Sequence, residues 1–62
     1  MLTRSFITLL NSDDNEVDQI EKYLEYIPPY IVYENEVYEL LHSYEPYRLT
    51  YKWVNALFIT HD

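Results

Sequence analysis

The residues best suited to do chemistry in this 62-residue chain are its carboxylates. Asp14, Asp18, Glu21 and Glu25 are spaced by four, three and four positions. That spacing places them in a row along one side of a helix. Carboxylates held on a rigid element can bind cationic groups of another protein through complementary charge. The row therefore predicts a binding surface and not a reaction centre.

Catalytic and metal-binding patterns are missing from the sequence. His42 and His61 are the two histidines, and they stand in no metal-ligand pattern. Ser12 and Ser43 lack the glycines of a nucleophile elbow. The run DDNEVD lacks the glycine and the twelve-residue pattern of an EF-hand. We therefore expect no enzyme activity, no metal and no cofactor.

The segment that carries the acidic row also carries apolar residues with helical spacing. These would face a core: Val17, Ile20, Leu24 and Ile27. Ser12 or Asp13 could cap the helix, and Asp13 with Glu16 has the spacing of a capping box. Pro28-Pro29 would end it. The pattern predicts an acidic amphipathic helix over about 13–27.

The remaining segments favour strands, at about 3–10, 30–34, 37–42 and 47–59. Glu34-Asn35 could turn a hairpin, although helical spacing leaves a second helix over 34–44 open. The last strand could continue or turn near Asn55-Ala56 and resume at 57–60. The prediction is a single α+β domain over 1–62, with one helix packed on a small antiparallel sheet of three to four strands.

Charge is unevenly placed along the chain. Eleven acids and four bases give a net charge of −7. Residues 12–27 carry −5 (six acids less Lys22), residues 28–45 carry −4, and no base occurs between Lys22 and Arg48. Nucleic acid and an anionic membrane are disfavoured as direct ligands because both require a basic surface. The apolar run near the N-terminus is too short to span a membrane, so we expect a soluble cytoplasmic protein.

The chain resembles a class of small bacteriophage proteins. It is short, acidic and tyrosine-rich, has no glycine or cysteine, and concentrates its acids in SDDNEVDQIEKYLEY and YENEVYELLHSYE. These features are similar to those of phage host-takeover proteins of the DNA-mimic type. That class includes inhibitors of uracil-DNA glycosylase and of the bacterial nucleoid protein HU, and the HU inhibitor is closest in character.

The resemblance implies a DNA-mimic inhibitor that occupies the DNA-binding surface of a basic host protein such as HU in the host cytoplasm. Such an inhibitor could act as a homodimer. The predicted contacts are eight carboxylates: Asp13, Asp14, Asp18, Glu21, Glu25, Glu34, Glu36 and Glu39. The alternative is a small adaptor or inhibitor that binds a non-DNA site through Tyr, Leu and Trp. Its target would be RNA polymerase, a protease or a division protein. Eight tyrosines favour an apolar interface of this kind and also self-association.

Overall fold

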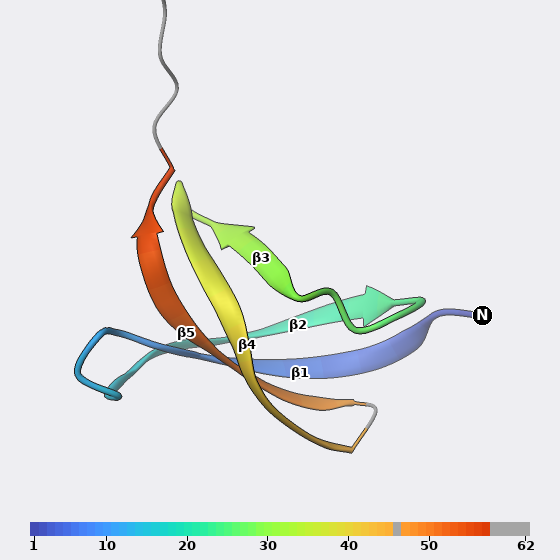
Figure 1. Cartoon of the computed structure of the whole chain (residues 1–62). Coiled ribbons are helices and arrows are strands. Elements are labelled where there is room, and N and C mark those ends of the chain that lie inside the picture. The colour runs from blue at the N-terminus through green and yellow to red at the C-terminus, as the bar shows by residue number, and fades with distance from the viewer. Residues whose placement is uncertain (46, 58–62) are drawn as a thin grey trace, which may run out of the picture.

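In the computed structural model, which describes residues 1–45 and 47–57, the chain folds as one curled sheet of five strands (Figure 1). The strands are β1 Thr3–Leu10, β2 Glu16–Leu24, β3 Tyr30–Tyr33, β4 Glu36–Glu45 and β5 Arg48–Ala56. Their order across the sheet is β2-β1-β5-β4-β3. No helix is present in the described residues, so the α+β prediction is wrong. Accordingly, no helix in this part of the chain has the length and apolar composition of a membrane span.

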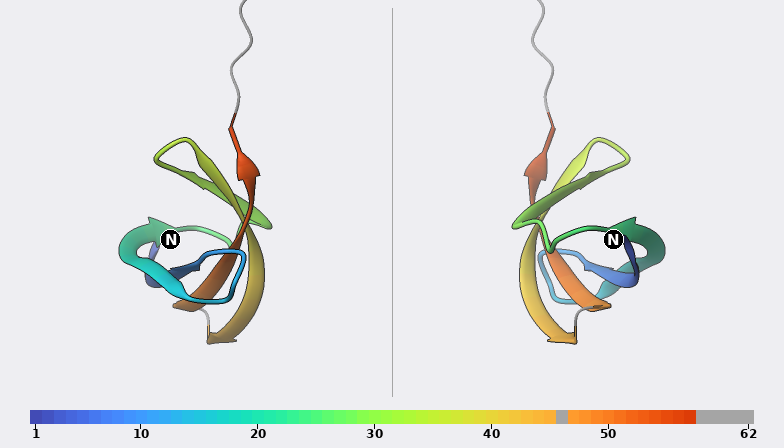
Figure 2. Two further views of the ribbon diagram at one scale, coloured as in Figure 1. Left: turned by 90° about the vertical axis from the view of Figure 1, so that its left-hand side faces the viewer. Right: turned by 90° about the vertical axis from the view of Figure 1, so that its right-hand side faces the viewer.

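The sheet curls into a half-barrel whose two edge strands, β2 and β3, approach each other (Figure 2). Neighbouring strands are antiparallel except β1 and β5, which are parallel. The Tyr33 hydroxyl donates a hydrogen bond to Asp18 Oδ2 at 2.7 Å and so links the two edges. The Tyr51 hydroxyl donates to the Pro28 carbonyl at 2.6 Å, which ties the β2–β3 connection to the central strand β5.

The core lies on one face of this sheet, which we call the inner face; the opposite face is the outer face. Side chains alternate between the faces of a strand, so the buried positions occur at every second residue of β1 and β5. Ile7 on β1 is in register with Ile20 on β2 and Leu49 on β5, which builds one apolar layer. The buried apolar residues are Ile7, Leu9, Ile31, Tyr38, Leu49 and Tyr51.

The predicted helix over about 13–27 is wrong, since Glu16–Leu24 forms strand β2, which pairs antiparallel with β1. Ile20 and Leu24 are four residues apart, and that spacing fits a strand period of two as well as a helical period. Both lie half-buried on the inner face of β2, where Ile20 lies beside Ile7. Val17 and Ile27, which fit only the helical pattern, are 53% and 38% exposed. As a strand, the segment packs Ile20 and Leu24 against the core and pairs its backbone with β1.

Asn11 builds the turn that replaces the predicted helix start. Its side-chain oxygen accepts hydrogen bonds from the backbone N–H of Asp13 at 2.8 Å and of Asn15 at 3.0 Å. Its own N–H donates to the Asn15 carbonyl at 2.9 Å. Asp14 adopts φ 66°, in the left-handed region that Asp and Asn tolerate. Neither Ser12 nor Asp13 is therefore a helix cap.

Two other local predictions are confirmed. The strand over 3–10 is confirmed, and so is the hairpin at Glu34-Asn35, which excludes the second helix. The last strand continues through Ala56 without turning. Its predicted resumption at 57–60 is wrong for Leu57, and residues 58–60 lie outside the described residues. The predicted sheet of three to four antiparallel strands is also wrong, because the sheet has five strands and β1 pairs with β5 in parallel.

Glu34 occupies an unfavourable backbone conformation in the β3–β4 turn. Its φ is 50° and that of Asn35 is 64°. The left-handed conformation costs an ordinary L-residue about 1–2 kcal/mol, whereas Asn adopts it readily. We expect Glu34→Asn to stabilise the fold by about 0.5–1 kcal/mol in urea unfolding. Glu34→Gln makes the same charge change without the backbone benefit, so an equal gain in that control would contradict the explanation.

Candidate functional site

Six carboxylates lie in or beside the β1–β2 and β3–β4 turns. In Figure 1 the β1–β2 turn lies at the lower left and the β3–β4 turn lies above it, beside the C-terminal end of β5, and the left view of Figure 2 shows them as two separate loops. The Tyr33–Asp18 hydrogen bond joins the two turn regions directly. We call this region the acidic end: Asp13, Asp14, Glu16, Asp18, Glu34 and Glu36. The base that reaches it is Lys52, whose Nζ lies 2.8 Å from Asp14 Oδ1.

Asp18 and Tyr33 form the electrostatic centre of the acidic end. The hydrogen bond from Tyr33, followed by that from the Gln19 N–H at 2.8 Å, lowers the pKa of Asp18. The same bond to Asp18 is the main cause that raises the pKa of Tyr33 to about 12. Burial raises the pKa of Tyr38, and the nearby carboxylates of the acidic end raise it further. Their negative potential therefore extends into the core.

The Tyr33–Asp18 bond predicts a pH-dependent contribution to stability. The raised pKa of Tyr33 stabilises the fold below about pH 10, and this contribution is lost as the pH rises toward 12. The lowered pKa of Asp18 stabilises the fold above about pH 4, and this contribution is lost in acid. The difference in urea midpoint between the wild type and Tyr33→Phe should be largest near neutrality and shrink at both extremes. Tyr26→Phe, at an exposed tyrosine, is the control, and a Tyr33→Phe difference that stayed constant with pH would contradict the assignment.

The carboxylates of the acidic end differ in how far they are neutralised. Asp14 is paired with Lys52, Asp18 accepts the Tyr33 hydroxyl, and Glu36 accepts a hydrogen bond from Trp53 Nε1. Glu16 accepts a hydrogen bond from Gln19 Nε2 at 3.3 Å. Asp13 and Glu34 are exposed, and their carboxylates make no contact of this kind with the described residues. These two side chains are the most available to a partner.

Three of the eight predicted contact residues lie elsewhere. Asp18 and Glu21 point to opposite faces of β2, so the predicted row of four carboxylates does not exist. Glu21 lies on the outer face and pairs with Arg4. Glu25 follows the far end of β2, and Glu39 lies on the outer face of β4 in register with Lys52. The predicted row fails because Glu16–Leu24 is a strand and not part of a helix.

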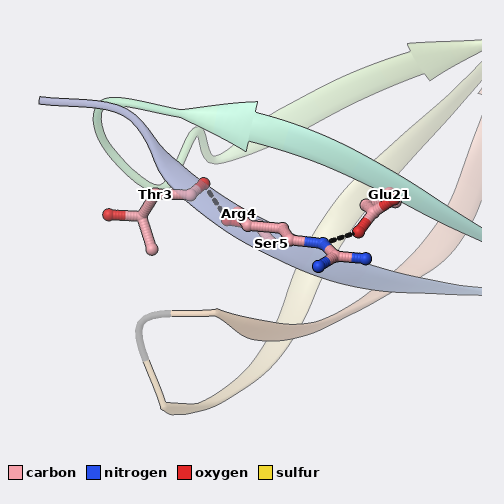
Figure 3. Close-up of polar contacts among 4 residues, drawn as sticks. All are labelled: Thr3, Arg4, Ser5 and Glu21. Carbon is pink, nitrogen blue, oxygen red and sulfur yellow. Dashed lines mark hydrogen bonds and ion pairs between the residues drawn. The ribbon is translucent and has the colours of Figure 1, made fainter.

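The outer face also carries a hollow of about 520 Å³, which the sequence did not predict. Parallel pairing of β1 with β5 sets Phe6 in register with Arg48. This pairing brings both arginines of the chain, Arg4 and Arg48, to the hollow. Arg4 pairs with Glu21 (Figure 3). Its guanidinium carbon lies 5.3 Å from the centre of the Phe6 ring. The Glu21 carboxylate raises the pKa of Arg4. The hollow is lined by Arg4, Phe6, Ile7, Thr8, Gln19, Ile20, Glu21, Tyr44, Arg48, Leu49 and Thr50.

The polar side chains of the hollow come from strands far apart in the sequence. On β5 the buried residues alternate with Arg48, Thr50 and Lys52. This alternation in the sequence was sufficient to predict that β5 has a polar outer face. The pairing of β5 with β1 was the missing information. In the part of the chain that the structure describes, no group of three or more His, Cys, Asp or Glu residues is placed to hold a metal ion.

Comparison with known proteins gave no relative. No protein-family model, no curated protein and no solved structure matches the chain.

Proposed function

We propose that this protein is an acidic DNA-mimic inhibitor that binds the DNA-binding surface of a basic host protein through its acidic end. The observation that carries the proposal is the position of six carboxylates in two turns and the adjoining strand ends, which the Tyr33–Asp18 hydrogen bond links, with Lys52 paired to one of them, Asp14. The acidic end therefore carries a net charge of −5, from six acids less one base, out of −7 for the chain. The resemblance to phage DNA mimics supports the same reading.

A basic groove shaped for phosphates would attract such a surface. Clustered charge of one sign steers a complementary partner and raises the rate of association. Asp13 and Glu34 project from separate turns, so they can contact separate basic side chains of the partner. The nucleoid protein HU is our best candidate, which would place the inhibitor in the host cytoplasm.

Capture from a bacterial lysate tests the proposal. The tagged protein is incubated with lysate at low salt, washed and eluted with a salt gradient. A DNA-binding protein released early in the gradient and displaced by duplex DNA would support a mimic, because surface charge interactions weaken steeply with salt. A partner that is retained at high salt and unaffected by DNA would contradict it.

A second candidate function is favoured by apolar side chains on the outer face. Tyr44 is 74% exposed and stacks on His42, while Tyr23, Tyr30 and Phe6 are 61%, 53% and 46% exposed. An adaptor or inhibitor of RNA polymerase, a protease or a division protein could use such rings as an interface core. In that case Tyr44→Ala would weaken partner binding at high salt, and neutralising the acidic end would not.

A further inference from the structure

β2 is one of the two edge strands of the sheet. β2 pairs with β1 on one side, and none of the strands formed by residues 1–45 and 47–57 pairs with its other side. The Gln19 N–H donates to Asp18 Oδ1 at 2.8 Å, so it faces this edge and not β1. Backbone groups alternate in direction along an antiparallel strand, so those of Glu21 face the edge as well. β2 therefore presents hydrogen-bonding groups that another strand could use.

The side chains along this edge are complementary to themselves under a twofold rotation. Asp18 and Lys22 lie on the inner face, two residues before and two residues after Ile20. In an antiparallel pair centred on Ile20, each Asp18 would lie opposite the partner's Lys22. Opposite charges in directly facing positions stabilise a sheet. Lys22 is exposed and forms no ion pair or hydrogen bond with the described residues, so its ammonium is available.

We propose that two copies of this chain pair antiparallel along β2 about a twofold axis at Ile20, which joins their sheets edge to edge. The backbone groups of Gln19 would bond to those of the partner's Glu21. Asp18 would keep its Oδ2 contact with Tyr33 and exchange its Oδ1 contact with Gln19 for the partner's Lys22. Ile20, half-buried in the single chain, would be covered by the partner's Ile20.

The same charges specify this register against others. Charged residues on an edge strand ordinarily prevent indiscriminate pairing between sheets. A parallel pair in register would place Asp18 opposite Asp18 and Lys22 opposite Lys22, and like charges in facing positions are destabilising. A one-residue slip would move the inner-face residues opposite outer-face residues. This self-pairing does not depend on which protein the acidic end binds.

Disulfide trapping tests the register, and the absence of native cysteine makes each introduced thiol unique. Ile20→Cys would place two sulfur-bearing side chains in directly facing positions, within disulfide reach. We expect Ile20→Cys to form a covalent dimer rapidly under mild oxidation, reversible by reductant. Tyr23→Cys on the same strand and Val54→Cys on β5 are exposed controls that should stay monomeric at the same concentration. Equal cross-linking of all three would overturn the proposal.

Sedimentation equilibrium tests the charge pairing without any thiol. We expect the wild type to dimerise and Lys22→Glu to raise the dissociation constant of the dimer more than about tenfold, because each Asp18 would then face a carboxylate. Arg48→Glu makes the same charge change on the outer face of β5, away from the edge, and should leave the dimer intact. A wild type that is monomeric throughout, or a dimer that persists in Lys22→Glu, would overturn the proposal.

Discussion

Leu49→Ala should leave most of the protein unfolded at 25 °C. Leu49 is 2% exposed and lies on β5 between Ile7 of β1 and Ser43 of β4. Truncation of a buried leucine costs about 2–5 kcal/mol. A domain of this size has a total stability of only about 3–5 kcal/mol from its core. Loss of this one side chain therefore removes most or all of the free energy of unfolding.

Urea unfolding followed by far-ultraviolet circular dichroism measures the effect. Val54→Ala on the same strand is the matched control because its side chain is 42% exposed. We expect it to change stability by less than about 1 kcal/mol, the span of strand propensities. If Leu49→Ala lowered the free energy of unfolding by less than about 0.5 kcal/mol, Leu49 would not belong to the core.

The second large effect concerns partner binding. The double variant Asp13→Asn with Glu34→Gln removes the two carboxylates of the acidic end that form no hydrogen bond or ion pair with the described residues. We expect the dissociation constant for the basic partner to rise by more than about tenfold, because charge pairs at an interface contribute on the order of 1.5 kcal/mol or more each. The fold should be retained, since neither carboxylate holds another side chain through a hydrogen bond or an ion pair.

The matched control is Glu25→Gln with Glu39→Gln. It removes the same amount of charge from exposed side chains outside the acidic end. General loss of negative potential would weaken both double variants equally, whereas a localised contact weakens only the first. Equal affinities for the two variants would show that net charge, and not the acidic end, governs binding. The comparison should be made at two salt concentrations, because the difference between the variants should narrow at high salt.

Local sequence patterns were sufficient where only one secondary structure satisfied them. Tyr47 to Trp53 alternates strictly, and the structure has a strand over this stretch from Arg48 onward. Asn35 tolerates positive φ, and it forms a hairpin turn without glycine. The strand over 3–10 was likewise fixed by its composition.

The segment 16–24 was mispredicted because its apolar residues fit two periods. Ile20 and Leu24 suit both a helix and a strand, and the choice was made by pairing with β1, which no local pattern contains. The error carried over to the site. A helix would have aligned Asp18 with Glu21, whereas the strand turned Glu21 to the outer face and brought Asp18 to Tyr33, fifteen residues away.

The most direct test of the proposed function is displacement of a fluorescent DNA duplex from purified HU, followed by anisotropy at low salt. We predict that the wild-type protein releases the duplex in a concentration-dependent manner, and that Asp13→Asn with Glu34→Gln requires more than about ten times as much protein. If the duplex stayed bound at saturating inhibitor while the two proteins formed a complex, the acidic end would not occupy the DNA-binding surface. If no complex formed, HU would not be the partner, and the lysate capture would identify the protein to be tested in its place.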